Sequence, residues 1–315
     1  MKGFTSIQDV ARLEDLLSLA RSMKADPHQF TMLGRGKTLC LLFFNPSLRT
    51  RLSTQKAAQL LGMHVMVMNL NSDGWNIELE DGTTMNGSSQ EHIKEAAGVV
   101  SRYCDIIGLR TFASLDDRDK DYEEVLMNKF IAHATVPVIS LESATLHPLQ
   151  SLADLMTIRE QARTHRPKVV LTWAPHPKAL PQAVANSFVQ WMRASEVDLV
   201  ITHPPGLELA PRFVEGLKVT HCQEEALEGA DFVYAKNWSS YTDYGKSVEG
   251  WEDWMITEEK MAMTHNGKLM HCLPVRRNVV VSDAVLDGPQ SIVLEQAHNR
   301  VYAAQAVLKM LLDEA

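Results

Sequence analysis

Short apolar runs alternate with longer amphipathic segments along the chain. A strand is predicted at residues 38–44, TLCLLFF, because a continuous apolar run of this length is typical of a strand buried on both faces. A helix is predicted before it, at 7–23, where apolar residues recur three and four positions apart, and another after it, at 50–61, ending at Gly62. This alternation predicts an α/β fold with parallel sheets covered by helices on both faces.

The same alternation continues to the end of the chain and predicts two doubly wound sheets, one in each of two domains. Further strands are expected at 64–70, 105–110, 136–140, 168–173, 197–203, 231–237, 268–274 and 291–294. Further helices are expected at 89–102, 121–132, 148–163, 181–194, 257–264 and 296–312. A boundary near 142–150 divides the strands evenly between the domains.

Composition and charge exclude several classes of protein. The chain of 315 residues has a formal net charge of −8 and no basic block, which argues against nucleic acid as a partner. No apolar run approaches the roughly 20 residues that a membrane span needs, and the first residues lack the pattern of a signal peptide. The four cysteines form no C-x-x-C, so reduced thiols and a cytoplasmic location are expected. The histidines show no metal-ligand spacing, and we expect neither a metal nor a cofactor.

The most informative stretch, FFNPSLRTRLS at 43–53, directly follows the first strand. Ser47 and Thr50 suit the start of a helix, where free N–H groups and the helix dipole attract anions. Arg49 and Arg51 add two guanidinium groups, so the stretch predicts a site for a phosphate dianion. For this stretch alone, a capped helix with solvated arginines is the alternative.

Other polar clusters also follow predicted strands. Ligands of doubly wound sheets bind beyond the carboxyl ends of the strands, so these clusters are expected to converge. The missing G-x-G-x-x-G argues against a nicotinamide-dependent dehydrogenase, and GRGKT at 34–38 precedes its strand instead of following it as a phosphate-binding loop would. The clusters are Arg110, 142–150, Lys236-Asn237 and 271–277.

Three motifs together resemble the carbamoyltransferase (transcarbamylase) family. They are FFNPSLRTR, HPLQ at 147–150 and HCLPVRR at 271–277, in the family's order and spread over the whole chain. The resemblance implies an enzyme that uses carbamoyl phosphate as a carbamoyl donor. A catalytically silent paralogue is the alternative, but it would have lost an arginine or His147, and all are present.

The resemblance also implies an architecture. Residues 1–147 would form a carbamoyl phosphate-binding domain and 148–298 an acceptor-binding domain, with the last helix, 299–315, packing on the first domain. It further implies a homotrimer whose active sites are shared between subunits. The branch of the family that acts on acylated ornithines has a deep backbone knot, which the loop at 174–181 would form here.

The family's residues for carbamoyl phosphate carry over to positions in this chain. Thr50, Arg110 and His147 are expected to stabilise the oxyanion that forms when an amine attacks the carbonyl carbon. Cys272 is expected beside that amine and not as a covalent nucleophile. The residues implied to bind carbamoyl phosphate are Ser47, Leu48 through its backbone, Arg49, Thr50, Trp75 from the neighbouring subunit, Arg110, His147, Gln150, Cys272, Leu273 and Arg300.

The acceptor is implied by a departure from the ornithine-type motif D-x-W-x-S-M-G. Lys236, in YAKNWSSYTDYG, stands where that motif has the aspartate that binds the α-ammonium of ornithine. A lysine suits an acylated, neutral α-amine, so an N-acylated ornithine is the implied acceptor. The residues implied to bind it are Glu142, His176, Lys236, Arg276 and Gln90.

Two positions bear on the acyl group. Succinyl-type relatives tend to have proline at the position of Gln90, and acetyl-type relatives have glutamate, which would repel a succinyl carboxylate. Acetyl-type relatives also tend to have lysine where this chain has Gln305. Both positions favour a succinylated ornithine, used in arginine biosynthesis, over the alternatives, acetylated ornithine and, less well, free ornithine.

Overall fold

The structure is a computed structural model that describes residues 3–314, apart from the side chain of Asn71. Residues 1, 2 and 315, which the predicted domain ranges include, lie outside the described residues. The chain divides into two compact units, and each contains one main parallel sheet with helices packed on it. This confirms the predicted α/β class. Unit 1 comprises 1–113, 119–152 and 300–315, and unit 2 comprises 114–118 and 153–299.

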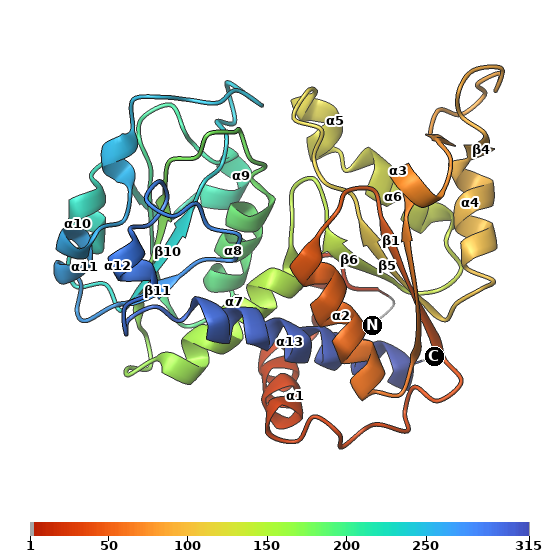
Figure 1. Ribbon diagram of the computed structural model, residues 1–315, viewed down its shortest axis with the longest axis horizontal. Helices are drawn as coiled ribbons and strands as arrows, with labels where there is room; N and C mark the ends of the chain where they lie inside the picture. Colours follow the sequence, from red (N-terminus) through yellow and green to blue (C-terminus); the bar gives the residue numbers. More distant parts are fainter. Residues whose placement is uncertain (1–2, 315) are drawn as a thin grey trace. The chain divides into compact units, whose positions relative to one another are not determined.

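Unit 1 is built around a four-stranded parallel sheet with the order β2-β1-β5-β6 (Figure 1). From β2 the chain crosses over β1 to reach β5, so the direction of winding reverses between β1 and β5. Such a reversal opens a crevice at the carboxyl ends of the two strands. The strands are β1 (Thr38–Phe43), β2 (His64–Asn69), β5 (Ile106–Arg110) and β6 (Val138–Glu142).

Alternation along the strands decides which helices cover each face of this sheet. Cys40 and Leu42 of β1 share a core with Ile107 and Leu109 of β5 and with residues of α4 and α6. Figure 1 shows α2 on the other side of the sheet. The remaining elements of this part of the chain are η1 (Ile7–Asp9), α1 (Leu13–Ala25), α2 (Leu48–Leu60), α3 (Leu70–Asp73), β3 (Ile77–Glu78), β4 (Glu91–His92), α4 (Ile93–Val100), α5 (Arg118–Tyr122) and α6 (Val125–His133).

Helix α2 ends where the sequence predicts, at a glycine. Gly62 has φ 80°, its N–H bonds to the Gln59 carbonyl at 3.0 Å, and the Met63 N–H bonds to the Ala58 carbonyl at 3.0 Å. This pair of bonds is a Schellman motif. A Cβ atom at position 62 would lie 2.1 Å from the carbonyl oxygen of Thr31, so no other residue fits without moving the backbone.

The last helix, α13 (Val293–Asp313), ends in unit 1. Gln305 donates through Nε2 to the Pro27 carbonyl at 2.9 Å, and the Lys309 ammonium lies 5.2 Å from the centre of the Phe30 ring. The predicted return of the C-terminal helix to the first domain is therefore confirmed.

Unit 2 has a five-stranded parallel sheet with the order β11-β10-β7-β8-β9, so its winding reverses between β7 and β10. The strands are β7 (Lys168–Trp173), β8 (Asp198–Thr202), β9 (Lys218–Thr220), β10 (Phe232–Lys236) and β11 (Lys268–Met270). The helices are α7 (Pro148–Gln161), which begins in unit 1, α8 (Ala183–Arg193), α9 (Pro211–Val214), α10 (Gln223–Leu227), η2 (Glu252–Trp254), α11 (Glu258–Ala262) and α12 (Asp283–Leu286).

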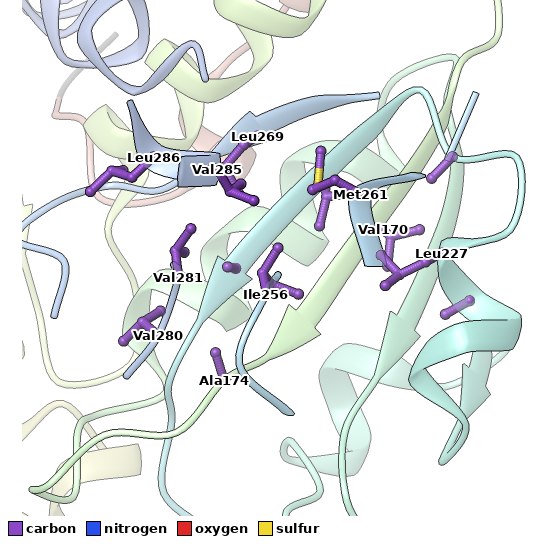
Figure 2. Close-up of a cluster of buried hydrophobic side chains, with 14 of the residues drawn as sticks. Val170, Ala174, Leu227, Ile256, Met261, Leu269, Val280, Val281, Val285 and Leu286 are labelled. Carbon is purple, nitrogen blue, oxygen red and sulfur yellow. The ribbon is translucent and has the colours of Figure 1, made fainter. Parts of the chain in front are cut away.

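One face of this second sheet carries the core shown in Figure 2. Val170 of β7 and Leu269 of β11 share an apolar cluster with Leu227 of α10, Met261 of α11 and Val285 of α12. The cluster is buried, which leaves the carboxyl ends of β7 and β10 as the polar edge of the unit.

The knot predicted around 174–181 stays a prediction. Two bonds join this loop to the segment after β10: the Asn237 side chain donates to the Ala174 carbonyl at 2.8 Å, and the Ser239 N–H donates to the Leu180 carbonyl at 2.8 Å. The loop at 174–181 is therefore in contact with the segment that follows β10.

Among the predicted elements that differ from the structure, three show a clear physical reason. The strand at 291–294 is wrong, because only Ser291 forms a bridge and α13 begins two residues later. The strand at 268–274 ends at Met270, since Leu273 has φ 56°, which no strand accommodates. The helix at 7–23 is interrupted, because the Asp9 carboxylate closes a separate turn around η1 by accepting backbone N–H groups at 2.6 and 3.1 Å.

Candidate active site

The carboxyl ends of β1 and β5 are tied together at the reversal point of unit 1. The Phe44 N–H donates to the Arg110 carbonyl at 3.1 Å, and the Phe112 N–H donates to the Asn45 side-chain oxygen at 3.1 Å. These bonds fix the segment that leads into α2 beside the end of β5. The first turn of α2 and the Arg110 side chain therefore start from neighbouring points of the same edge.

The N-terminus of α2 presents groups that suit an anion. Ser47 is the N-cap, with φ −153°, and within the described residues its hydroxyl makes no capping hydrogen bond. The first N–H groups of a helix have no acceptor inside the helix, and the dipole adds positive potential there. The Leu48 side chain is 69% exposed, so its contribution to such a site would come from its backbone, as the resemblance implies.

Three guanidinium groups surround His147, which is buried. Burial lowers the pKa of His147 well below its usual 6.5, and the positive charges of Arg300, Arg110 and Arg49 lower it further, in that order. The imidazole is therefore neutral at physiological pH, and it can donate a hydrogen bond without adding a charge.

Arg300 connects two segments that are far apart in the sequence. Its guanidinium donates through Nη2 to the Thr50 hydroxyl at 2.6 Å and through Nη1 to the Gln150 side-chain oxygen. All three residues are buried and belong to unit 1. The structure thus brings together the three regions that the sequence associates with carbamoyl phosphate: the α2 start, HPLQ and the last helix.

Glu142 lies in this arginine cluster. Arg110 donates through Nη1 to a Glu142 carboxylate oxygen, which lies 3.6 Å from His147 Nε2. The resemblance assigns Glu142 to the acceptor, and that role remains a proposal, but in the structure its carboxylate offsets one of the three guanidinium charges. Two positive charges remain in the set, which matches a phosphate dianion.

Trp75 and Gln90 lie at one end of the small ribbon formed by β3 and β4. The Gln90 N–H donates to the Asn76 carbonyl at 3.0 Å, and the Trp75 indole donates to the Glu91 carboxylate at 2.8 Å. Trp75 is 52% exposed and borders a cavity of about 330 Å³. In the described part of this chain, no polar contact joins either side chain to the arginine cluster.

The acceptor residues predicted in unit 2 lie at its own reversal point. Lys236 is the last residue of β10 and pairs with Trp173, the last residue of β7. Its buried ammonium donates to the Asn237 carbonyl at 2.7 Å. His176 follows β7 by three residues, so both side chains start from the same edge of the sheet.

The charges of Lys236 and Arg276 both act on His176, so the three side chains form one electrostatic group. Partial burial is the main cause that lowers its pKa, and the charges of Lys236 and Arg276 lower it further, against an opposing contact with the Lys178 carbonyl. Two cations beside a neutral imidazole form a set that suits a carboxylate ligand.

The loop that carries Cys272 and Leu273 is held by a hydrogen-bond chain. The Leu273 N–H donates to His271 Nδ1 at 2.8 Å, and the His271 N–H donates to Gln296 Oε1 at 2.9 Å. Gln296 in turn donates to the buried carboxylate of Asp154 at 2.7 Å. Asp154 and Gln296 are not among the residues predicted from the sequence, although an acidic residue in the apolar segment SLADLM is a signal that could identify Asp154.

Cys272 itself is a half-buried free thiol, and all four cysteines fall within the described residues as free thiols. Its neighbour Tyr234 has a pKa raised well above 10 by burial, with smaller contributions from Asp154 and Cys272. Tyr234 therefore stays a neutral phenol, and the resemblance-based position of Cys272 beside an attacking amine remains a proposal.

The burial of His147 has a consequence for stability at acidic pH. Its pKa in the folded protein lies below the unfolded value of about 6.5, so between these two values the unfolded chain binds a proton that the folded protein does not. We expect the free energy of unfolding to fall below about pH 6.5, by up to about 1.4 kcal/mol per pH unit from this group. In His147→Asn this contribution is expected to be absent.

Urea unfolding of both proteins from pH 7.5 to 5.0 measures the effect. His176 and His203 also have lowered pKa values, so the difference between the two proteins isolates His147. Parallel stability curves for wild type and variant would contradict a neutral, buried His147.

Among the described residues, no group of three or more His, Cys, Asp or Glu side chains is placed to hold a metal ion. No helix in the part of the chain that the structure describes has the length and apolar character to span a membrane.

Two family models match the chain. The model of the aspartate/ornithine carbamoyltransferase carbamoyl-P binding domain matches residues 2–160, and that of the Asp/Orn binding domain matches 181–311. The N-succinylornithine carbamoyltransferase of Bacteroides thetaiotaomicron is 53% identical over 315 residues, covering 99% of each chain. The N-acetylornithine carbamoyltransferase of Xanthomonas axonopodis pv. citri is 37% identical, covering 100% of this chain and 98% of the relative.

A solved structure extends this similarity to the fold. It is a mutant of N-acetyl-L-ornithine transcarbamylase, with a glutamate replaced by alanine, complexed with carbamyl phosphate and N-succinyl-L-norvaline. It superimposes with a TM-score of 0.94 at 37% identity, covering 99% of this chain and 100% of the other. The two family models and these full-length relatives show that the chain belongs to the aspartate/ornithine carbamoyltransferase family.

Proposed function

We propose that the chain transfers the carbamoyl group of carbamoyl phosphate to the δ-amine of N2-succinyl-L-ornithine, giving N2-succinyl-L-citrulline and phosphate, in arginine biosynthesis. The observation that carries the donor half is the set of three guanidinium groups around the neutral His147. The 53% identity with an N-succinylornithine carbamoyltransferase over nearly the whole chain supports the acceptor half.

The donor is proposed to bind with its phosphate at the start of α2. Ser47, the first N–H groups and Arg49 would hold the phosphate, and the Thr50 hydroxyl is already oriented by Arg300 at 2.6 Å. The carbonyl oxygen would face Arg110 and His147. A guanidinium and a neutral imidazole N–H then stabilise the negative charge that develops on this oxygen during attack.

The reaction needs no strong base from the protein. A neutral δ-amine forms the new C–N bond, and the bond between the carbonyl carbon and the phosphate-linked oxygen breaks. The leaving phosphate can take the proton that the amine loses, so positioning and electrostatics supply most of the rate. Cys272 and Leu273 are proposed to border the amine through their loop.

The acyl-ornithine is proposed to bind through its carboxylates. Lys236 and Arg276 supply the cationic side next to the neutral imidazole of His176, and Gln90 and Glu142 complete the proposed set. Free ornithine would bring an α-ammonium to two cations, whereas a succinylated one brings an additional carboxylate. A similar transcarbamylase, in which one glutamate is replaced by alanine, is complexed with the succinylated analogue N-succinyl-L-norvaline, which supports a succinylated ligand for this fold.

We further propose a cytoplasmic homotrimer with active sites shared between subunits. Leu48 and Leu52 lie one turn apart on α2 and are 69% and 57% exposed, which is unusual for leucines beside a ligand-binding helix start. Trp75 is also largely exposed, and the ribbon that carries it is fixed by its own hydrogen bonds. Apolar side chains of this size on the surface support a subunit contact.

The identity of the acceptor can be tested by varying the charge of the acyl group and the charge of residue 90. We expect succinylornithine to be the best acceptor, acetylornithine to be poorer by roughly ten- to a hundred-fold in kcat/KM, and free ornithine to be used barely. Gln90→Glu is expected to shift the preference toward acetylornithine, because it adds a like charge near the succinyl carboxylate. Isotopic carbamoyl transfer to each acceptor gives the values.

Gln8→Glu is the matched control, since Gln8 is exposed and undergoes the same chemical change. A wild type that prefers acetylornithine would refute the proposed acceptor and leave carbamoyl transfer intact. An unchanged preference in Gln90→Glu would show that position 90 does not border the acyl group.

A further inference from the structure

Four residues, Ser143 to Leu146, separate Glu142 from His147 in unit 1. The Ser143 N–H donates to the Leu146 carbonyl at 2.8 Å, and the Leu146 N–H donates to the Ser143 hydroxyl at 3.1 Å. These bonds close the loop on itself. The conformation of the loop therefore sets the spacing between Glu142, the partner of Arg110, and His147.

A single carboxylate outside the loop holds it in place. Glu124 accepts the Ser143 hydroxyl at 2.6 Å, the Ala144 N–H at 3.1 Å, the Thr145 N–H at 2.8 Å and also the Thr145 hydroxyl. Three of these donors point at Oε1 and one at Oε2, so both oxygens of the carboxylate accept from the loop. Burial raises the pKa of Glu124, and the four donors oppose that rise by stabilising the ionised form.

The backbone of Glu124 is also unusual. It has φ 53° and ψ 39°, the left-handed conformation that side chains other than glycine rarely adopt, at the N-cap of α6. Its carbonyl accepts the Asn128 N–H at 2.9 Å, which begins the helix. Such a conformation persists only where surrounding contacts hold it, and it occurs often at functional sites.

We propose that Glu124 is a positioning residue for carbamoyl transfer, which anchors the 143–146 loop and thereby sets Glu142 and His147 against the arginine cluster. The inference rests on the proposed function and adds to it a residue that does not touch the substrate. Misplacement of reacting groups by about 1 Å can cost about a hundred-fold in rate, so loss of the anchor should reduce catalysis well beyond its effect on folding.

Glu124→Gln tests the anchor, because glutamine keeps the shape but turns an amide NH₂ toward the loop donors. We expect kcat/KM for carbamoyl phosphate to fall about 30- to 100-fold, mainly through kcat, with a melting temperature within a few degrees of wild type. Glu123→Gln is the matched control, since Glu123 is the exposed neighbour. Hydrogen exchange of a peptide covering 143–147 should be faster in Glu124→Gln and unchanged in the control.

Thr145→Val removes one of the four donors and is expected to lower kcat/KM by about three- to ten-fold. Its effect should largely vanish in the Glu124→Gln background, because both changes break the same contact. If Glu124→Gln does not fold, the kinetics of Thr145→Val become the test. A Thr145→Val variant with the kcat/KM of the wild type would then refute the positioning role of Glu124.

The experiments distinguish failure of the positioning role from failure of the proposed function. Equal kcat/KM in Glu124→Gln and Glu123→Gln would overturn the positioning role while the proposed function stands. A wild type that transfers no carbamoyl group to any acceptor would refute the proposed function and the catalytic role of Glu124 together. Unchanged exchange at 143–147 in Glu124→Gln would refute the anchor itself, whatever the activity.

Discussion

Arg49→Met is expected to lower kcat/KM for carbamoyl phosphate about a thousand-fold, because charge-assisted contacts to a leaving phosphate are worth several kcal/mol in the transition state. Arg49 is half-buried at the start of α2, and its charge acts on His147 together with those of Arg110 and Arg300. Methionine keeps the length and apolar character of the side chain, so α2 should remain folded. Steady-state kinetics with varied carbamoyl phosphate measure the loss.

Arg35→Met serves as the control, since Arg35 is exposed and has the same charge. Its kinetics should match the wild type, and circular dichroism should show all three proteins folded. Activity of Arg49→Met within ten-fold of the control would exclude Arg49 from the phosphate site and place the anion elsewhere.

Trp75→Ala and His147→Ala are each expected to lose at least about a hundred-fold in activity as homo-oligomers. When the two are mixed after reversible dissociation, about a quarter of the sites should regain both residues by random assortment, because each site of the proposed oligomer would take Trp75 and His147 from different subunits. The recovered activity should therefore approach a quarter of the wild-type value. Mass photometry of the same samples establishes the oligomeric state.

Mixing His147→Ala with Arg110→Ala gives the matched negative control, since both residues lie in one arginine cluster of one subunit. That mixture should recover nothing. Any of three results would contradict a site shared through Trp75. They are recovery of activity only in the control mixture, a protein that is monomeric in solution, and no recovery in the mixture that contains Trp75→Ala.

Much of the fold could be predicted because buried parallel strands are continuous apolar runs. The strand at 168–173 coincides with β7. The polar residues that were predicted to follow the strands lie at the carboxyl ends of β1, β5, β7 and β10. The short β9 was missed because its residues, Lys218–Thr220, are largely exposed and show no apolar run. The run at 291–294 was too short to distinguish a strand from the start of a helix.

The candidate site was predicted unevenly for a related reason. Residues that bind an anion show in a sequence as clustered arginines and hydroxyls, and the S-L-R-T-R stretch has both. Glu124 and Asp154 are acidic residues in predicted helical segments, where most acidic side chains are solvated. Only tertiary structure shows that they are buried against the donors of a loop or of Gln296.

The bond from Arg300 to Thr50 also matters for synthesis of the chain. These residues are 250 positions apart, so the arginine cluster of unit 1 is incomplete until nearly the whole polypeptide has left the ribosome. A nascent chain that stalls after the sheet of unit 1 has formed would contain Arg49 and Thr50. It would lack the guanidinium group of Arg300, which orients the Thr50 hydroxyl. The proposed site for an acyl phosphate would thereby be completed only after the residues proposed to bind the acceptor have also been made.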